Sequence, residues 1–280
     1  MQANGQRLLF LQNGTIREAE KEAQLLKAAI LMVSYGTAVK AAWERTLGRM
    51  EAEIRKRYAA WDLISAFTSR RMIEKWRQQG YEVRSEEEAL RQLSEEGYQQ
   101  VVLLPTHLVS GSEYETVAAE AKRYQAQFQH LQLGKPLLES AQARRQVAAA
   151  ISREAHLGEE EVLVVIGHGT ETKGSSVYPK LETELSQLVS GRAVVGTLRD
   201  GQSLIERLKT LEKRQIRLMP LLLTAGRHAQ QDIAGEKPES IKSQLIRCGF
   251  TVQTIEKGMG ELASIRSVYY QQLEHLIETR

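Results

Sequence analysis

The chain has 280 residues, 42% hydrophobic and 26% charged, which is typical of a globular protein with one large α/β domain or two smaller lobes. The formal net charge is only +3, so the composition gives no support for nucleic-acid binding, and no nucleic-acid partner is expected. The single cysteine, Cys248, excludes an intrachain disulfide and a cysteine-rich metal site.

Residues 1–26 are predicted to form an extension ahead of the folded part of the chain. Their apolar residues are too few for the core of a signal peptide, and the stretch from Arg17 to Lys27 is charged. No later run reaches the roughly 18 apolar residues that a membrane span requires. We therefore expect a cytoplasmic protein without a membrane partner.

From Lys27 onward, short apolar runs alternate with long helix-like stretches, a pattern that predicts βαβ units and a mostly parallel sheet. The predicted strands are Ala29–Ser34, Leu63–Phe67, Gln100–Pro105, Val162–Ile166, Ala193–Gly196, Arg217–Leu223 and Phe250–Ile255. The predicted helices are Val39–Tyr58, Ser69–Gln79, Glu86–Glu96, Tyr114–Gln129, Ala141–His156, Tyr178–Leu188, Ser203–Leu211, Pro238–Cys248 and Glu261–Glu278.

The two halves of the chain also resemble each other. The segment ILMVSYGT at 30–37 aligns with LVVIGHGT at 163–170, and LLP at 103–105 aligns with LMP at 218–220. The fold class is therefore predicted to be α/β with two similar lobes, each a mostly parallel sheet flanked by helices. The expected lobes span residues 27–157 and 158–280, with the active site in the cleft between them.

Two histidines stand just past the ends of predicted strands, His168 in Ile-Gly-His-Gly-Thr and His228 in Ala-Gly-Arg-His-Ala. Open α/β sheets bind ligands at the carboxyl ends of their strands, where the loops emerge. Imidazole is the commonest nitrogen ligand of metals and also exchanges protons near neutral pH. We therefore predict one catalytic site built from two loops, in which both histidines are suited to metal binding or to proton transfer.

Further polar residues follow other strand ends, and two functions stay open for most of them. Asp200 is a candidate third metal ligand, although an Asp-Gly pair is also an ordinary turn. Thr170 either caps the next helix or donates to a substrate carboxylate. Arg227 would suit a polycarboxylate substrate, but its charge beside His228 would weaken cation binding.

The N-terminal lobe offers matching positions. In the alignment Tyr35 corresponds to His168, and Tyr35 and Thr37 are candidate substrate-binding residues. His107 lies in the loop that corresponds to the His228 loop. Glu113 is either an acid at the start of a helix or a carboxylate that faces the cleft.

Several familiar motifs are absent from the sequence: there is no Walker loop, no Gly-x-Gly-x-x-Gly and no Gly-x-Ser-x-Gly. No nucleotide cofactor and no acyl-enzyme chemistry are therefore expected.

Taken together, the chain resembles the anaerobic cobalt chelatases, the sirohydrochlorin cobaltochelatases of vitamin B12 synthesis, which are related to class II ferrochelatases. The resemblance runs from about Ala28 to Ile277. It is carried by the segments VSYGT at 33–37, AFTSRRMI at 66–73, His107 with GSEY at 111–114, GHGTE at 167–171, AGRHA at 225–229 with Asp232 and AG at 234–235, and GMGE at 258–261.

The resemblance implies two lobes that clasp a tetrapyrrole, and it implies that His168 and His228 bind the incoming metal ion. The chain departs from the family pattern at three places. Arg227 stands where an acid usually precedes the second histidine, Thr172 where a further histidine is usual, and Leu198-Arg199-Asp200 where a glutamate is usual.

The first hypothesis is an ATP-independent chelatase that inserts Co2+, or else Fe2+ or Ni2+, into sirohydrochlorin. The second is a non-catalytic tetrapyrrole or metal carrier on the same fold. A third is a two-lobed module that binds a small molecule without a metal. The sequence leaves the oligomeric state open between a monomer and a homo-oligomer.

Overall fold

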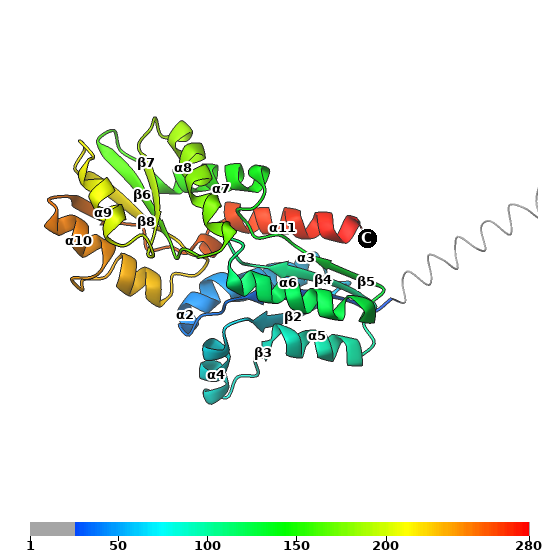
Figure 1. Cartoon of the computed structure of the whole chain (residues 1–280). Coiled ribbons are helices and arrows are strands. Elements are labelled where there is room, and N and C mark those ends of the chain that lie inside the picture. Colours follow the sequence, from blue (N-terminus) through cyan, green and yellow to red (C-terminus); the bar gives the residue numbers. More distant parts are fainter. Residues whose placement is uncertain (1–25, 280) are drawn as a thin grey trace, which may run out of the picture.

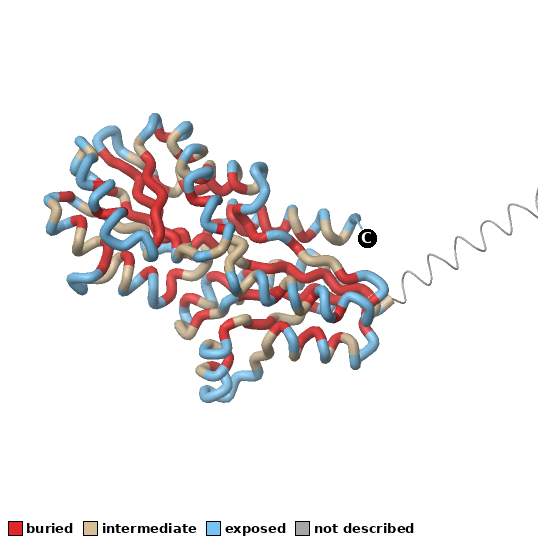
Figure 2. The backbone as a smooth tube through the Cα atoms, in the orientation of Figure 1, coloured by how far each residue is buried: buried red, intermediate tan, exposed pale blue. Residues whose placement is uncertain are grey.

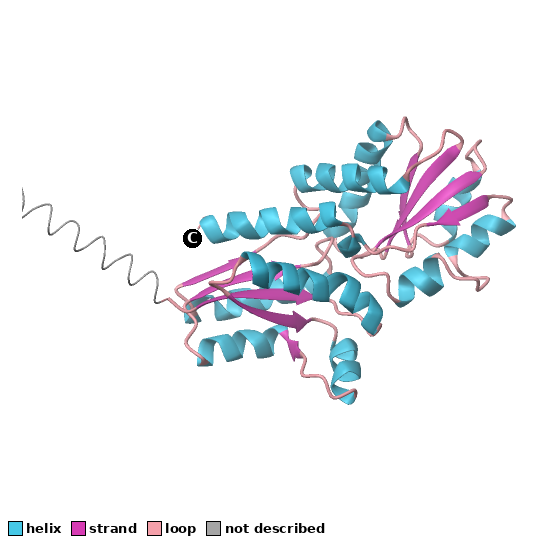
Figure 3. Cartoon of the chain, turned by 180° about the vertical axis from the view of Figure 1, so that it is seen from behind, coloured by secondary structure: helices cyan, strands magenta, loops and turns pink. Residues whose placement is uncertain are grey.

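The computed structural model describes residues 26–279, so the predicted extension at 1–26 lies almost wholly outside the described residues. Two separate β-sheets, each covered by helices, make up the described part of the chain (Figure 3). The predicted α/β class is confirmed, because every strand pair within these residues is parallel.

The N-terminal sheet has the strand order β3-β2-β1-β4-β5. Its strands are β1 (Ala28–Ser34), β2 (Asp62–Phe67), β3 (Arg84–Ser85), β4 (Gln100–Pro105) and β5 (His130–Leu133). The two central strands β1 and β4 are almost entirely buried, which explains why both read as unbroken apolar runs rather than alternating ones.

The C-terminal sheet has the order β7-β6-β8-β9, with β6 (Glu161–Gly167), β7 (Ala193–Thr197), β8 (Gln215–Leu221) and β9 (Thr251–Thr254). The order matches β2-β1-β4-β5 of the first sheet. The register matches as well, because Val33 pairs with Pro105 in one sheet and Ile166 pairs with Pro220 in the other. The internal repeat in the sequence is thus repeated in the strand order.

Helices cover both faces of each sheet (Figure 1). In the N-terminal lobe, α5 (Glu86–Glu95) and α6 (Ser112–Tyr124) pack on one face, and α3 (Arg49–Arg57) and α4 (Arg70–Gln78) lie on the other. Against the C-terminal sheet, α9 (Gln202–Lys209) and α10 (Ile241–Arg247) share a core with one face, and α7 (Ala141–Ala155) and α8 (Val177–Leu188) share a core with the other.

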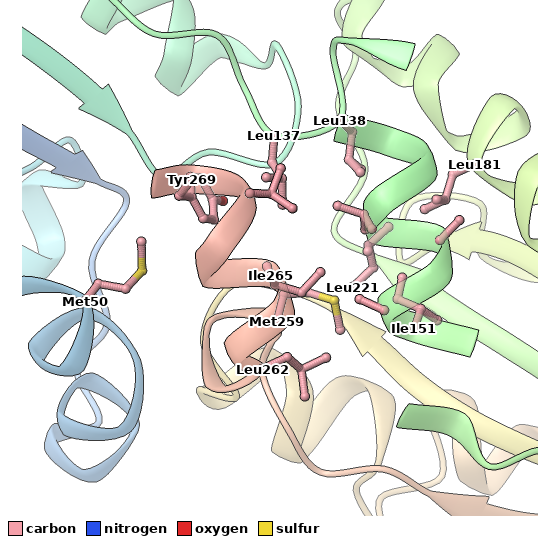
Figure 4. Packing of buried hydrophobic residues seen from close by; sticks show 14 of the residues in the cluster. Met50, Leu137, Leu138, Ile151, Leu181, Leu221, Met259, Leu262, Ile265 and Tyr269 are labelled. Atoms are coloured by element: carbon pink, nitrogen blue, oxygen red, sulfur yellow. The ribbon is translucent and has the colours of Figure 1, made fainter. Parts of the chain in front are cut away.

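One hydrophobic core joins the two lobes. The last helix, α11 (Ala263–Glu278), contacts both α7 and β4, and so lies between the lobes (Figure 1). Figure 4 shows Tyr269 and Ile265 of α11 packed between residues of both lobes. Figure 2 shows the buried strands of both sheets and the buried faces of these helices. This shared core links the two sheets and the loops at their ends.

Polar contacts add to this junction. Arg266 on α11 is 2% exposed and forms a two-point ion pair with Glu53 on α3, at 3.0 and 3.1 Å. Burial alone would raise the pKa of Glu53, but hydrogen bonds from Arg266, Tyr270 and Arg49 lower it to about 2. The Glu53 carboxylate is therefore ionised across the ordinary pH range.

The structure departs from the sequence prediction mainly in short elements. Strands β3 and β5 were not predicted, and β5 begins at His130, just past the predicted helix at 114–129. The predicted helix at 39–58 consists of α2 (Lys40–Trp43), a π-helical turn at Glu44–Gly48 and α3.

Within the described residues no helix is long and apolar enough to span a membrane. The proposed lobes at 27–157 and 158–280 stay a prediction.

Candidate active site

The two candidate histidines follow neighbouring central strands of the C-terminal sheet. His168 comes directly after β6, and His228 starts a π-helical segment, His228–Ile233, that follows β8. Because β6 and β8 are paired in parallel, their carboxyl ends meet at the same edge of the sheet. Both histidines are exposed there.

The two imidazole rings lie beside each other, with their centroids 5.0 Å apart and their planes at 76°. The Nδ1 atom of His168 lies 3.2 Å from the carbonyl oxygen of Gly169, and Nδ1 of His228 lies 2.6 Å from Oδ2 of Asp232. With Nδ1–H donating in both rings, each Nε2 keeps a free lone pair. A pair of such nitrogens is suited to bind one divalent metal ion.

Both glycines beside His168 are required by close packing. A Cβ on Gly167 would lie 2.6 Å from Cε1 of Tyr178, whose ring packs under the loop. Gly169 has a φ of +86°, and a Cβ there would lie 2.8 Å from Cγ of Arg199. The backbone N–H of Gly169 donates to the Tyr178 hydroxyl at 3.2 Å. Tyr178 therefore supports the backbone that presents His168, a role that the sequence did not suggest.

Asp232 was recognised in the sequence only as part of a motif, and its contact with His228 was not foreseen. The two residues are four positions apart, a spacing that places side chains on one face of a helical turn. A carboxylate behind a metal-binding imidazole fixes the ring orientation and its tautomer. The His-x-x-x-Asp spacing in the sequence was the signal that could have predicted this contact.

Loops of the N-terminal lobe meet both histidine loops. A Cβ on Gly226 would lie 3.1 Å from Oγ1 of Thr37, and a Cβ on Gly111 would lie 3.2 Å from Oγ1 of Thr170. The Thr172 hydroxyl also donates to the backbone oxygen of Ser110. The candidate site is therefore bordered by loops from both lobes.

The carboxylate of Asp200 is engaged by the backbone at the end of β7. Its carboxylate accepts a hydrogen bond from the backbone N–H of Thr197 at 2.6 Å, as expected for a turn after β7. Across residues 26–279, no three His, Cys, Asp or Glu side chains gather in a way that could hold a metal ion. Asp200 therefore does not join His168 and His228 in a common group.

The helix boundaries bear on the alternative roles left open for Thr170 and Glu113. Thr170 does not cap a helix, because Thr172 caps the short 3-10 turn at Lys173–Ser176 and α8 follows only after Ser176. Glu113 lies in the first turn of α6, where an acid stabilises the helix dipole, and it is partly buried.

The remaining candidates differ in exposure. Tyr35 is 47% exposed at the end of β1, and Thr37 is buried with its carbonyl oxygen bound to Nε1 of Trp76 at 2.6 Å. Arg227 is exposed and donates to Gln231. The ring nitrogens of His107 are buried without a hydrogen-bond partner among residues 26–279, and burial lowers its pKa to about 4.

Comparison with known proteins agrees with this architecture. Residues 28–278 match the family model for cobalt chelatase (CbiK). A sirohydrochlorin cobaltochelatase from Salmonella typhimurium is 30% identical over 256 residues, covering 90% of this chain and 97% of the relative. The sirohydrochlorin cobaltochelatase CbiKC from Nitratidesulfovibrio vulgaris is 29% identical over 264 residues, covering 92% of each.

The fold is shared with a more distant solved structure. The sirohydrochlorin chelatase SirB from Bacillus subtilis subspecies spizizenii, in complex with cobalt, aligns with a TM-score of 0.62 at 14% identity, over 90% of this chain and 96% of that one. The family model and the shared fold together define a two-lobed protein of the chelatase type. More specifically, the chain belongs to the CbiK cobalt chelatase family.

Proposed function

We propose that this protein inserts Co2+ into sirohydrochlorin without ATP, and that His168 and His228 bind the metal ion before its transfer. Family membership and the names of the two relatives support the reaction. The observation that carries the role of the histidines is the pair of rings 5.0 Å apart, each with Nδ1 already engaged.

The geometry suits a metal ion that has to leave again. Two neutral imidazoles supply only part of a coordination shell, so water and then the pyrrole nitrogens of the macrocycle can fill the open positions. Because metal ligation needs neutral histidine, Co2+ affinity is expected to fall in acid. A closed shell of protein ligands would hold the metal ion too tightly for transfer.

Insertion also releases two protons from the macrocycle. When the metal ion moves to the pyrrole nitrogens, the Nε2 lone pair of His228 becomes free and can accept a proton. The Asp232 carboxylate, 2.6 Å from Nδ1, would stabilise the imidazolium that results. His168 has only a backbone carbonyl at its Nδ1, so we assign one of the two protons to His228, and the other passes to solvent water.

The substrate contacts are part of the same proposal. Tyr35 offers an exposed ring at the end of β1, which suits contact with a flat macrocycle. Thr37, Thr170 and Arg227 border the histidine loops and are proposed contacts, Arg227 for a substrate carboxylate. For His107, Glu113 and Asp200 the assigned roles stay predictions from the sequence, as do the cytoplasmic location and the lack of a nucleotide, and the oligomeric state stays open.

A non-catalytic carrier is the second candidate, and the position of Arg227 favours it. This arginine stands directly before His228, and a positive charge at that place disfavours a cation in the site. A carrier would bind the macrocycle or the metal ion without accelerating their combination.

An anaerobic absorbance assay separates the two candidates. Sirohydrochlorin and Co2+ are mixed with and without the protein, and the rate of formation of the metallated spectrum is compared. A clear protein-dependent acceleration is expected, and repeating it with Fe2+ and Ni2+ ranks the metals. A bound macrocycle without any acceleration would instead establish the carrier.

A further inference from the structure

A hollow of about 320 Å³, lined by both polar and apolar residues, lies beside the loop that presents His168. Its lining includes hydroxyl groups and two arginines, namely Thr170, Ser175, Thr197, Ser203, Arg199 and Arg207. Asp200 lines it too, with one carboxylate oxygen bound to the backbone N–H of Thr197. The hydroxyls of Ser175 and Ser203 already donate to backbone carbonyls, so the guanidinium groups are the main donors that suit a carboxylate ligand.

The two arginines differ in how firmly their charge is already paired. A guanidinium nitrogen of Arg207 lies 2.5 Å from one carboxylate oxygen of Glu182, and the Glu182 side chain is only 24% exposed. The other carboxylate oxygen accepts a hydrogen bond from the backbone N–H of Val195 at 2.8 Å. Glu182 is therefore held in place. Arg199 pairs with Glu171, whose side chain is 81% exposed and has no other hydrogen-bond partner identified among residues 26–279. Of the two glutamates, only Glu171 can give up its ion pair to a ligand carboxylate without breaking other contacts.

Arg199 is also the arginine close to the histidine loop. Its stem packs against Gly169, the residue after His168, so closely that a Cβ on Gly169 would lie 2.8 Å from its Cγ. The Arg199 side chain is 46% exposed. An incoming anion can therefore reach the guanidinium without any change in the buried core.

We propose that Arg199 binds a side-chain carboxylate of the macrocycle, and that Glu171 neutralises Arg199 until the substrate displaces it. This inference rests on the proposed function for the identity of the macrocycle, since sirohydrochlorin carries acetate and propionate groups. It makes Arg199 a specificity-determining residue and Glu171 its internal competitor. A macrocycle without charged side chains would gain nothing from Arg199.

Three variants test the pair. Arg199→Gln removes the charge that binds the carboxylate, and Glu171→Gln removes the competitor. Glu206→Gln is the matched control, because it makes the same charge change on a 56% exposed glutamate that pairs with Lys209 on α9. Metal-free sirohydrochlorin is titrated into each protein and its dissociation constant is read from the change in macrocycle absorbance.

The two substitutions are expected to act in opposite directions. Arg199→Gln should weaken macrocycle binding about fivefold, and Glu171→Gln should strengthen it about twofold, as expected for solvent-exposed charge pairs. Glu171→Gln should have no effect once Arg199 is glutamine. The methyl-ester form of the macrocycle should bind all variants alike, and Co2+ affinity without the macrocycle should not change.

Equal affinity of Arg199→Gln and the wild type for sirohydrochlorin would overturn the inference, and so would weaker binding by Glu171→Gln. The outcome is independent of turnover. If the wild type fails to accelerate Co2+ insertion while Arg199→Gln still loses macrocycle affinity, the chelatase proposal fails and the carboxylate site stands.

Discussion

Removal of the Asp232 carboxylate should weaken metal binding while leaving the fold intact. In Asp232→Ala, the Nδ1 atom of His228 loses the acceptor that lies 2.6 Å away. The ring is then free to rotate and to change its tautomer, so that Nε2 is directed toward the metal position only part of the time. His168 keeps its own contact with the carbonyl of Gly169.

The size of the effect follows from the exposure of the pair. Loss of a hydrogen bond behind a metal ligand typically costs about 10- to 100-fold in affinity. The side chains of His228 and Asp232 are 48% and 44% exposed, so water replaces part of the lost interaction. We therefore expect the lower end of the range, about a tenfold rise in the Co2+ dissociation constant, or about 1.4 kcal/mol.

Isothermal titration with Co2+ in the absence of macrocycle measures this directly. The matched control is Gln231→Ala, which removes the neighbouring exposed side chain that accepts from Arg227 and leaves Asp232 in place. The control should bind Co2+ like the wild type. Equal affinities of Asp232→Ala and the wild type would refute the argument that Asp232 orients His228.

Three further predictions concern stability and the junction of the lobes. Burial lowers the pKa of His107 from 6.5 to about 4 in the folded protein. As the pH falls from 6.5 to about 4, the unfolded chain binds this proton while the folded protein does not, so the free energy of unfolding falls by about 3 kcal/mol. His107→Phe should flatten this part of the stability curve measured by urea unfolding. Gly174→Ala would place a Cβ 2.3 Å from the backbone oxygen of Ser110, and should lower both the melting temperature and macrocycle affinity by separating the two loops. Arg266→Ala leaves Glu53 without its buried partner, and should cost about 3 kcal/mol in urea unfolding.

Exposed residues supply the controls for these variants. His130→Phe makes the same substitution at an exposed histidine and is the control for His107→Phe. Lys173→Ala, next to Gly174, should not disturb the loop contact. Arg45→Ala breaks a half-exposed pair with Glu261 and should cost less than about 1 kcal/mol. A loss as large as that of Arg266→Ala would contradict the importance assigned to burial.

The sequence predicted the long elements well because their signals are strong. Strand β4 is buried throughout and apolar after Gln100, and it was placed at its observed bounds, Gln100–Pro105. The edge strands β3 and β5 have two and four residues, too few for a periodic pattern, and pairing with β2 and β4 makes them strands. The π-helical turn at His228–Ile233 has no sequence signature at all.

The site was predictable to the extent that it depends on strand ends. His168 and His228 were found because each follows a central strand, and parallel pairing brings such positions together. The contact of Thr172 with Ser110 depends on how the lobes are oriented, which no local pattern contains. Asp200 was proposed as a ligand because it follows a strand end, and the structure adds that its carboxylate accepts from the backbone N–H of Thr197.

The most direct test of the account compares the initial rate of Co2+ insertion into sirohydrochlorin for the wild type, His168→Ala and His228→Ala. His275→Ala, which alters an exposed histidine on α11, is the control. The account predicts that both site variants fall to the uncatalysed rate while circular dichroism shows an unchanged fold, and that the control keeps full activity. Insertion rates equal to the wild type in both His168→Ala and His228→Ala would contradict the assignment of the metal site.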